Sequence, residues 1–442
     1  MESTVMKAVT RRLMPFLVLL YLVAYIDRSN VGFAKLTLQD QLGLSNAAFT
    51  FGQVAFFIAY AIFEVPSNVY LDRFGARRWF TRIMLSWGVV TVLTSLVSND
   101  WQFYAARFLL GVAEAGFYPG VLYYLTKWYP YRYRARMTGW FMMSAPLAFI
   151  IGNPVMGALD DLDGTFGLQG WQWIFIATGV PAIVLGFVTL RLLPDGPEGV
   201  RWLAAEEQAW IAGELNAEAN ALGERGHGSP LRALRDKRVV LLSLFYLCFP
   251  LGAYGLSFWL PTIVDGFGGL STTATGFITA IPYVFVAIGL YVVPKLADRS
   301  GTRYPWIAGT AALGLAASAL TGNHVLQMAF ISVAAMCIFA GQPVLWSLPS
   351  RFLTGIQAAS GIAVINAVGN LGGGFGPMGI GVVVDRTGSA VGGLWFLVAA
   401  MVIAAVATPG VRRLVEGGPV VAHAPDTSAT ATGRTKVSTT RD

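Results

Sequence analysis

The chain has 442 residues, of which 55% are hydrophobic and 12% are charged, and its formal net charge is +7. A soluble chain of this size needs about a quarter of its residues charged to cover its surface, so the composition excludes a soluble globular protein and indicates a polytopic membrane protein. The two cysteines, Cys248 and Cys337, lie in apolar runs and no CxxC pair occurs, so we expect no disulfide framework, metal site or cofactor.

Twelve long apolar runs, broken by Gly, Pro or charge, predict twelve transmembrane helices, because each span needs about 20 apolar residues. The first run follows a basic N-terminus and lacks a small-residue cleavage site, so we expect an uncleaved span rather than a signal peptide. The first six spans are predicted at residues 13–34, 47–70, 79–97, 101–128, 137–158 and 171–192. The second six are predicted at residues 238–262, 274–297, 304–321, 325–350, 357–384 and 391–411.

The positive charges divide unequally between the two sides of these spans. Of the 31 Lys and Arg residues, 27 fall on the side of the N-terminus, two (Lys35 and Arg386) on the opposite side and two (Arg28 and Arg107) within spans. Because positive charge collects in cytoplasmic loops, both termini are predicted to be cytoplasmic. The basic inner surface would face the anionic headgroups of the lipid bilayer, and the net charge implies no nucleic-acid partner.

The longest polar stretch divides the chain into two parts. Within it, an Ala- and Glu-rich segment at residues 203–222 is predicted to form an amphipathic surface helix. We therefore expect a six-helix half at residues 1–192, a cytoplasmic linker at 193–237, a second six-helix half at 238–414 and a disordered cytoplasmic tail at 415–442.

A short pattern, D-R-x-G-x-R, follows the second span and recurs 226 residues later, after the eighth. Its Gly permits a tight turn and its charges can pin one helix end to a neighbour, so it predicts a cytoplasmic latch in each half. The alternative is ordinary positive-inside loop chemistry. The latch residues are Asp72, Arg73, Gly75 and Arg77 in the first half and Asp298, Arg299 and Arg303 in the second.

Helix-weakening pairs late in the fifth and eleventh spans, in Gly152-Asn153-Pro154 and Gly376-Pro377, support an internal repeat. With this repeat the chain resembles the major facilitator superfamily. The resemblance implies an all-α fold of twelve transmembrane helices in two six-helix halves, which rock around a central site to give alternating access. In that family the loop pattern usually starts with Gly four residues before the Asp. Here that position is Asn68, which weakens the expectation of close packing between spans 2 and 11 there.

Away from their ends, the predicted spans contain only five acidic or basic residues: Asp27, Arg28, Glu64, Arg107 and Glu114. An isolated charge near the middle of the bilayer costs at least about 2.5 kcal/mol, so such groups normally face the protein interior and are paired. Arg107 and Glu114 are seven residues apart, which places them on one helix face, about 10 Å apart along its axis. Both can line one cavity, which Asp27 and Arg28 would approach from the first span.

These residue types suit the transport of an anion together with protons. A carboxyl group in a cavity can bind and release a proton as the cavity opens to each side, whereas an arginine keeps its charge and matches a carboxylate in two-point contact. The alternative is that Asp27 and Arg28, and Arg107 and Glu114, form structural ion pairs that lock helices 1 and 4. Glu64 lies near the cytoplasmic end of span 2 and is interpreted as a gate or latch residue rather than a coupling site.

Polar and aromatic residues of the second half suggest the rest of the pocket. They recur at helical spacing in spans 7, 10 and 11 and could equally serve helix packing. The residues are Tyr246 and Tyr254 in span 7, Gln342, Trp346 and Ser350 in span 10, and Asn366 and Asn370 in span 11.

Four stretches resemble one branch of the superfamily, the anion:cation symporters, which include bacterial permeases for tartrate, phthalate, hydroxyphenylacetate and sugar acids. They are residues 25–30 (YIDRSN), 107–115 (RFLLGVAEA), 254–261 (YGLSFWLP) and 361–372 (GIA through Asn366 to Gly372). The resemblance implies that Asp27 and Glu114 carry protons, that Arg28 binds the substrate carboxylate and that Arg107 pairs with the acids and modulates their protonation. It also implies substrate contacts at Tyr60, Ser350 and Asn366.

One departure from this branch bears on the substrate. Where sugar-acid carriers place a Gln in span 5, this chain reads Met142-Met143-Ser144-Ala145-Pro146, which favours an aromatic, less hydroxylated or tartrate-like acid. We therefore expect a monomeric proton-coupled symporter that imports a small organic anion across a bacterial inner membrane. An anion exchanger or exporter, and a nutrient sensor, are the alternatives. An enzyme is disfavoured because no HExxH or GxSxG occurs and no reactive constellation surrounds His227, His324 or His423.

Overall fold

The computed structural model describes residues 2–223, 236–300, 304–346, 348 and 355–416, which form helices and connecting turns without any strand. The first part of the chain forms α1 (Glu2–Leu42), α2 (Asn46–Phe74), α3 (Ala76–Thr94), α4 (Asp100–Glu114), α5 (Phe117–Thr126), α6 (Tyr131–Met142), α7 (Ser144–Asp160), the short 3-10 helix η1 (Thr165–Gly167), α8 (Gly170–Leu192) and α9 (Ala205–Gly223). The second part forms α11 (Lys237–Asp265), α12 (Thr272–Ser300), α13 (Tyr304–Leu320), α14 (His324–Leu345), α15 (Gly355–Asn370), α16 (Gly372–Thr387) and α17 (Leu394–Glu416).

Each of the twelve predicted spans corresponds to one of these helices or to a consecutive pair, which confirms the predicted fold class. Three spans are pairs: α4 with α5, α6 with α7, and α15 with α16. Ten of the described helices or pairs are long and apolar enough to cross a membrane. The other two predicted spans are α3, which begins with three arginines (Arg77, Arg78 and Arg82), and α13, which has 17 residues.

The breaks within these spans do not lie at the helix-weakening pairs noted in the sequence. Spans 5 and 11 are interrupted at Met143 and Leu371, whereas α7 and α16 continue through Pro154 and Pro377. A proline is tolerated inside a membrane helix when neighbouring groups satisfy the freed backbone carbonyl. The break between α4 and α5 has a local cause, because Gly116 adopts φ +84°, a left-handed conformation that favours glycine.

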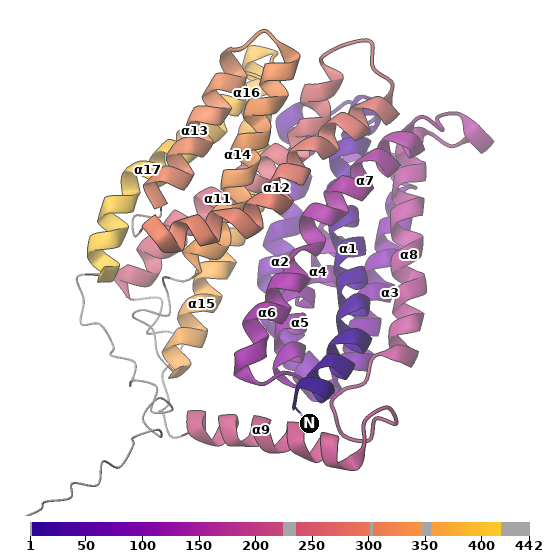
Figure 1. The fold of residues 1–442 in the computed structure, drawn as a ribbon. Helices are drawn as coiled ribbons and strands as arrows, with labels where there is room; N and C mark the ends of the chain where they lie inside the picture. The colour runs from indigo at the N-terminus through magenta and orange to yellow at the C-terminus, as the bar shows by residue number, and fades with distance from the viewer. Residues whose placement is uncertain (1, 224–235, 301–303, 347, 349–354, 417–442) are drawn as a thin grey trace, which may run out of the picture.

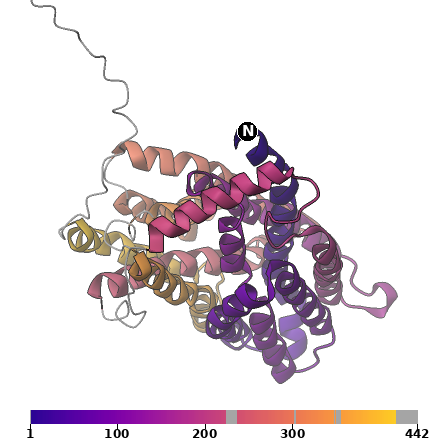
Figure 2. The same ribbon diagram turned by 90° about the horizontal axis from the view of Figure 1, so that it is seen from below.

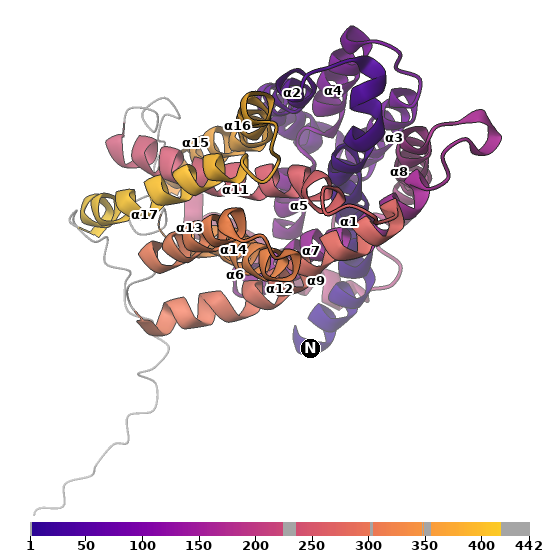
Figure 3. The ribbon, with the colours of Figure 1, turned by 90° about the horizontal axis from the view of Figure 1, so that it is seen from above.

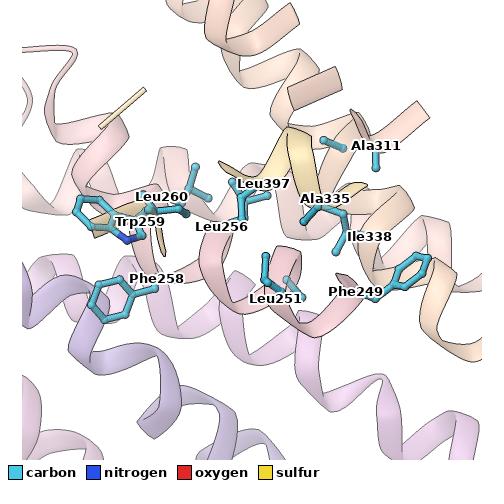
Figure 4. Packing of buried hydrophobic residues seen from close by; sticks show 14 of the residues in the cluster. Phe249, Leu251, Leu256, Phe258, Trp259, Leu260, Ala311, Ala335, Ile338 and Leu397 are labelled. Carbon is cyan, nitrogen blue, oxygen red and sulfur yellow. The ribbon is translucent and has the colours of Figure 1, made fainter. Parts of the chain in front are cut away.

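The helices form two groups that lie side by side, with α1 to α8 in one and α11 to α17 in the other (Figures 1 and 3). In the second group α11 is the central helix. Figure 4 shows its buried Phe249, Leu251 and Leu256 beside Ile338 of α14 and Leu397 of α17. The polar groups described below lie between the two groups.

The helix α9 lies across one end of the bundle (Figures 1 and 2) and confirms the predicted amphipathic surface helix. Its Ile211 is fully buried, while its acidic face contacts the start of α6. Glu218 accepts a hydrogen bond from Arg134 at 2.7 Å, and Glu214 accepts one from Arg132 at 3.1 Å. These contacts attach the linker to the first half.

The predicted latch of the first half also lies at the α9 end. Asp72 accepts a hydrogen bond from the Tyr123 hydroxyl and lies 3.7 Å from the Lys127 ammonium, so it ties α2 to α5. Gly75 joins α2 to α3 at φ +84°, and the linker residue Asp195 accepts a hydrogen bond from the backbone N–H of Arg77 at 2.8 Å. The side chain of Arg73 lies over the ring of Phe74. In the second half, the backbone of Asp298 and Arg299 belongs to α12, whereas their side chains and Arg303 lie outside the described residues.

At the end opposite α9, which we call the far end, the two halves meet through glycines that leave no room for a side chain. A Cβ atom on Gly157 of α7 would lie 2.2 Å from the carbonyl oxygen of Thr272 in α12. A Cβ atom on Gly381 of α16 would lie 2.9 Å from the carbonyl oxygen of Asn46 in α2. The absence of side chains at these glycines lets α7 approach α12, and α16 approach α2, at backbone distance.

Two aspartates cap helices of the opposite half at the same contacts. Asp161, just after α7, accepts hydrogen bonds from the backbone N–H groups of Thr272 (3.1 Å) and Thr273 (2.9 Å). Asp385 of α16 accepts hydrogen bonds from the backbone N–H groups of Asn46 and the next residue, each at 2.9 Å. A carboxylate at a helix N-terminus satisfies unpaired N–H groups and complements the helix dipole. Each half therefore supplies one cap to the other.

Candidate functional site

The centre of the interface between the halves holds an ion pair from the first half. Arg28 of α1 donates a hydrogen bond from Nε to Oε2 of Glu114 at the end of α4, at 2.9 Å. The side chains are 11% and 1% exposed. The guanidinium carbon of Arg28 also lies 5.6 Å from the ring centre of Tyr25 and 5.2 Å from that of Tyr60. Aromatic faces thus surround a cation that is paired with one acid.

The second half reaches this cation through Tyr254 of α11. Its hydroxyl oxygen lies 3.5 Å from Nη1 of Arg28, at the long end of hydrogen-bond distance. The ring of Tyr254 packs edge-on against Phe57 of α2, with 4.9 Å between ring centres. Three of the predicted substrate-site residues, Arg28, Tyr60 and Tyr254, therefore lie together.

Asp27, the second predicted proton carrier, is fully buried and its carboxylate is held by three donors. Oδ2 accepts hydrogen bonds from the Trp87 indole N–H (2.8 Å) and the Thr91 hydroxyl (3.1 Å) of α3, and Oδ1 accepts one from the Asn30 amide (3.0 Å). Asn30 also donates to Thr178 of α8 at 3.0 Å. Sequence reasoning missed these donors, although Asn30 is one helical turn from Asp27.

Arg107 differs from its neighbour Arg28 in its partners. It is 2% exposed on the same face of α4 as Glu114, as the seven-residue spacing predicts. Its Nη2 donates to the Gln53 amide oxygen at 3.0 Å, and its guanidinium lies over the ring of Phe56. The family resemblance implied that Arg107 pairs with the acids. The structure instead pairs Glu114 with Arg28, and Arg107 forms no ion pair with an acid among the described residues.

The other predicted residues of the second half flank this centre. Trp346, after α14, packs edge-on against Tyr246 of α11 with 4.9 Å between ring centres. Asn366 of α15 donates a hydrogen bond to Oε1 of Glu64 in α2 at 3.2 Å, which joins the two halves. Asn370 is half-buried one turn further along α15. Ser350 lies outside the described residues.

This arrangement can bind an anion but lacks the usual means of holding a metal. Among the described residues, no group of three or more His, Cys, Asp and Glu side chains could hold a metal ion. The buried charges are guanidinium and carboxyl groups that lie near aromatic rings and amides. Such a set can bind an acid by charge and by ring contact, and it can exchange protons through its carboxyl groups.

Comparison with known proteins shows the family of this chain. The family model described as Major Facilitator Superfamily matches residues 17–377. A "Quinolone resistance transporter" of Acinetobacter baumannii is 48% identical over 92% of this chain and 94% of its own length. A "Putative tartrate transporter" of Agrobacterium vitis is 43% identical over 92% of this chain and 94% of its own length.

Among solved structures, the inward-facing and unoccupied form of a bacterial homologue of the human lysosomal transporter Spinster matches with a TM-score of 0.74. The match covers 91% of this chain and 97% of that one at 18% identity, so it shows the fold alone. The relatives named for quinolone resistance and for tartrate show the family as well as the fold, because they are 48% and 43% identical over 92% of the chain. The chain therefore belongs to the major facilitator superfamily, a family of membrane transporters and not of enzymes.

Proposed function

We propose that the protein is a proton-coupled symporter that imports a small organic anion by alternating access. The substrate is a carboxylate such as tartrate, phthalate or another aromatic or hydroxy acid. The protein acts as a monomer in a bacterial inner membrane, with the α9 end and both termini in the cytoplasm. The distribution of Lys and Arg supports this orientation.

The observation that carries the proposal is the bond between Arg28 and Glu114. Glu114 occupies the guanidinium that a substrate carboxylate would need, so the two carboxylates compete for one cation. Protonation of Glu114 removes its charge and frees Arg28 for the anion. Deprotonation restores the internal pair and expels the anion, so proton and substrate favour each other's binding.

Asp27 is the second proton carrier in this scheme. Asp27 is on α1, but its carboxylate accepts hydrogen bonds from Trp87 and Thr91 of α3 and not from the residues proposed to bind the substrate. Its charge is close enough to interact with those of Glu114 and Arg107. A proton on Asp27 lowers the negative charge beside Glu114, so the two acids titrate as a pair. The contacts made by Arg28, Tyr60 and Tyr254 supply the binding side of the site.

An exporter or exchanger of similar carboxylates is the second candidate, favoured by the relative named for quinolone resistance. The fold and the ion pair suit both directions of movement, because alternating access is reversible.

Proton uptake into liposomes that contain the purified protein tests the proposal. The panel is tartrate, phthalate, a hydroxyphenylacetate, a sugar acid and nalidixate. Alkalinisation outside the liposomes that follows one acid is the expected result, and liposomes without protein are the control. Binding of an acid without any proton movement would contradict symport and favour an exchanger.

A further inference from the structure

A third carboxyl group, Glu64, lies at the centre of the interface and has no part in the coupling scheme. It is in α2, one helical turn after Tyr60, and its side chain is half-buried. Oε1 accepts the hydrogen bond from Asn366, whereas Oε2 is buried and accepts no hydrogen bond from the described residues. Glu64 is thus a carboxylate inside a span with one neutral partner.

Glu64 lies on the same side of α2 as a residue that contacts Arg28. It is one helical turn after Tyr60, whose ring centre lies 5.2 Å from the guanidinium carbon of Arg28. From the second half, Tyr254 reaches Arg28 and Asn366 reaches Glu64. Aromatic side chains from both halves therefore lie beside the cation, one helical turn from Glu64.

A role limited to joining the halves does not account for the charge of Glu64. An amide at this position could accept the same hydrogen bond from Asn366 without the cost of an ionisable group inside a span. A carboxylate at this position is more favourable in free energy than an amide only where it binds a positive charge or a proton. Among the described residues no cation pairs with Glu64, and Arg28 is already paired with Glu114, so a positive group on the ligand would supply the partner.

We propose that Glu64 binds a positively charged group of an amphoteric aromatic acid whose carboxylate lies at Arg28. This inference rests on the proposed function, because it takes the carboxylate of the substrate to be bound by Arg28. The substrate class is then an aromatic amino acid derivative or another ring system with an acid at one end and a protonated amine at the other. Tyr60 and Tyr254 contact the ring between these two ends.

Paired ligands test the charge at Glu64. We choose 4-(aminomethyl)benzoate and 4-ethylbenzoate as a short pair of equal shape. Ciprofloxacin and nalidixate form a long pair that differs in size as well, and in each pair only the first member carries a basic amine. Binding to the purified full chain is measured by calorimetry. The wild-type protein should bind the amine-bearing member of at least one pair more tightly, and Glu64→Gln should weaken that binding at least about tenfold. The affinity of Glu64→Gln for the amine-free member should change by less than about twofold.

Asn366→Ala is the matched control, because it removes the hydrogen bond to Glu64 and keeps the carboxylate. It should preserve the preference for the amine. Equal losses for both members of a pair in Glu64→Gln and in Asn366→Ala would show that Glu64 only joins the halves, and would overturn the inference while the proposed function stands. A wild-type protein that binds the amine-free acids but never prefers the amine overturns it as well. Failure of the wild-type protein to bind any of the four acids also overturns the inference, whereas the proposed function is decided by the liposome panel.

Discussion

The centre and the far end of the interface between the halves differ in symmetry. At the far end, Asp161 and Asp385 are 224 residues apart, and the helix starts that they cap, Thr272 and Asn46, are 226 residues apart. The second half repeats the same contacts there, with offsets of 224 residues at the aspartates and 226 at the helix starts. At the centre, the position 226 residues after Arg28 is Tyr254, and the two side chains contact each other. An arginine and a tyrosine thus stand at positions related by the same offset of 226 residues as the two helix starts.

The charged residues and the equivalent caps thus lie in different parts of the interface. When two halves rock, the contact between α7 and α12 and the contact between α16 and α2 must separate equally, so equivalent caps at both contacts suit this motion. Coupling requires a cation and acids that compete for one another, and the first half supplies Asp27, Arg28, Arg107 and Glu114 together. The second half supplies aromatic and amide groups, which can select the shape of a substrate without adding charge.

The largest effect is expected from a change that removes the planar cation at the centre. Arg28→Lys keeps the charge but loses the two-point geometry and the contact with the Tyr60 ring. Binding of the transported acid should weaken at least about thirtyfold, because losing a buried charged contact costs about 2–5 kcal/mol. Calorimetry on the purified variant measures this loss. Unchanged affinity in a folded variant would remove Arg28 from the binding site.

The next effect tests coupling without removing the binding cation. Glu114→Gln has no charge at position 114 at any pH, so Arg28 stays available and anion affinity should lose the part of its pH dependence that comes from Glu114, leaving only the part due to Asp27. Proton-driven accumulation in liposomes should be abolished, while counterflow of the anion remains. The matched control is Asp163→Asn, which alters a carboxylate that caps Gly170 within one half. Full accumulation by Glu114→Gln would contradict the coupling role.

The sequence predicted the helices, and the charged residues that meet at the centre, better than the pairing between these residues. Hydropathy and charge located a helix or a helix pair for each of the twelve predicted spans, because the bilayer imposes both patterns. The partner of Glu114 could not be read from spacing, since Arg28 and Arg107 are on different helices and only packing decides which one reaches it. The far-end caps were missed, although each aspartate follows a glycine by four residues, at Gly157 and Gly381. This pattern is short and gains meaning only when the opposite helix start is known to lie beside it.

The smallest effect is expected at the far end, where equivalent caps predict equal effects of equivalent changes. Partial burial opposes ionisation of Asp161, but hydrogen bonds from Thr273 and Thr272 outweigh it and hold its pKa below the ordinary value, so the cap is charged at neutral pH. Asp161→Asn and Asp385→Asn should each weaken closure of the far end by about 0.3–1 kcal/mol. Together they should shift the ratio of closed to open far ends about threefold to thirtyfold.

Spin labels on Ser98→Cys and Gly322→Cys measure this shift, since both positions are exposed, follow α3 and α13 at the far end and belong to different halves. The native Cys248 and Cys337 are buried and would be replaced by alanine. The distance between the two labels is short when the far end is closed and long when it is open. The population with the long distance should rise to a similar extent in each single variant and more in the double variant, with Asp163→Asn again as the control. A change confined to one single variant would mean that one contact alone closes the far end, and that its two sides are alike in geometry but not in energy.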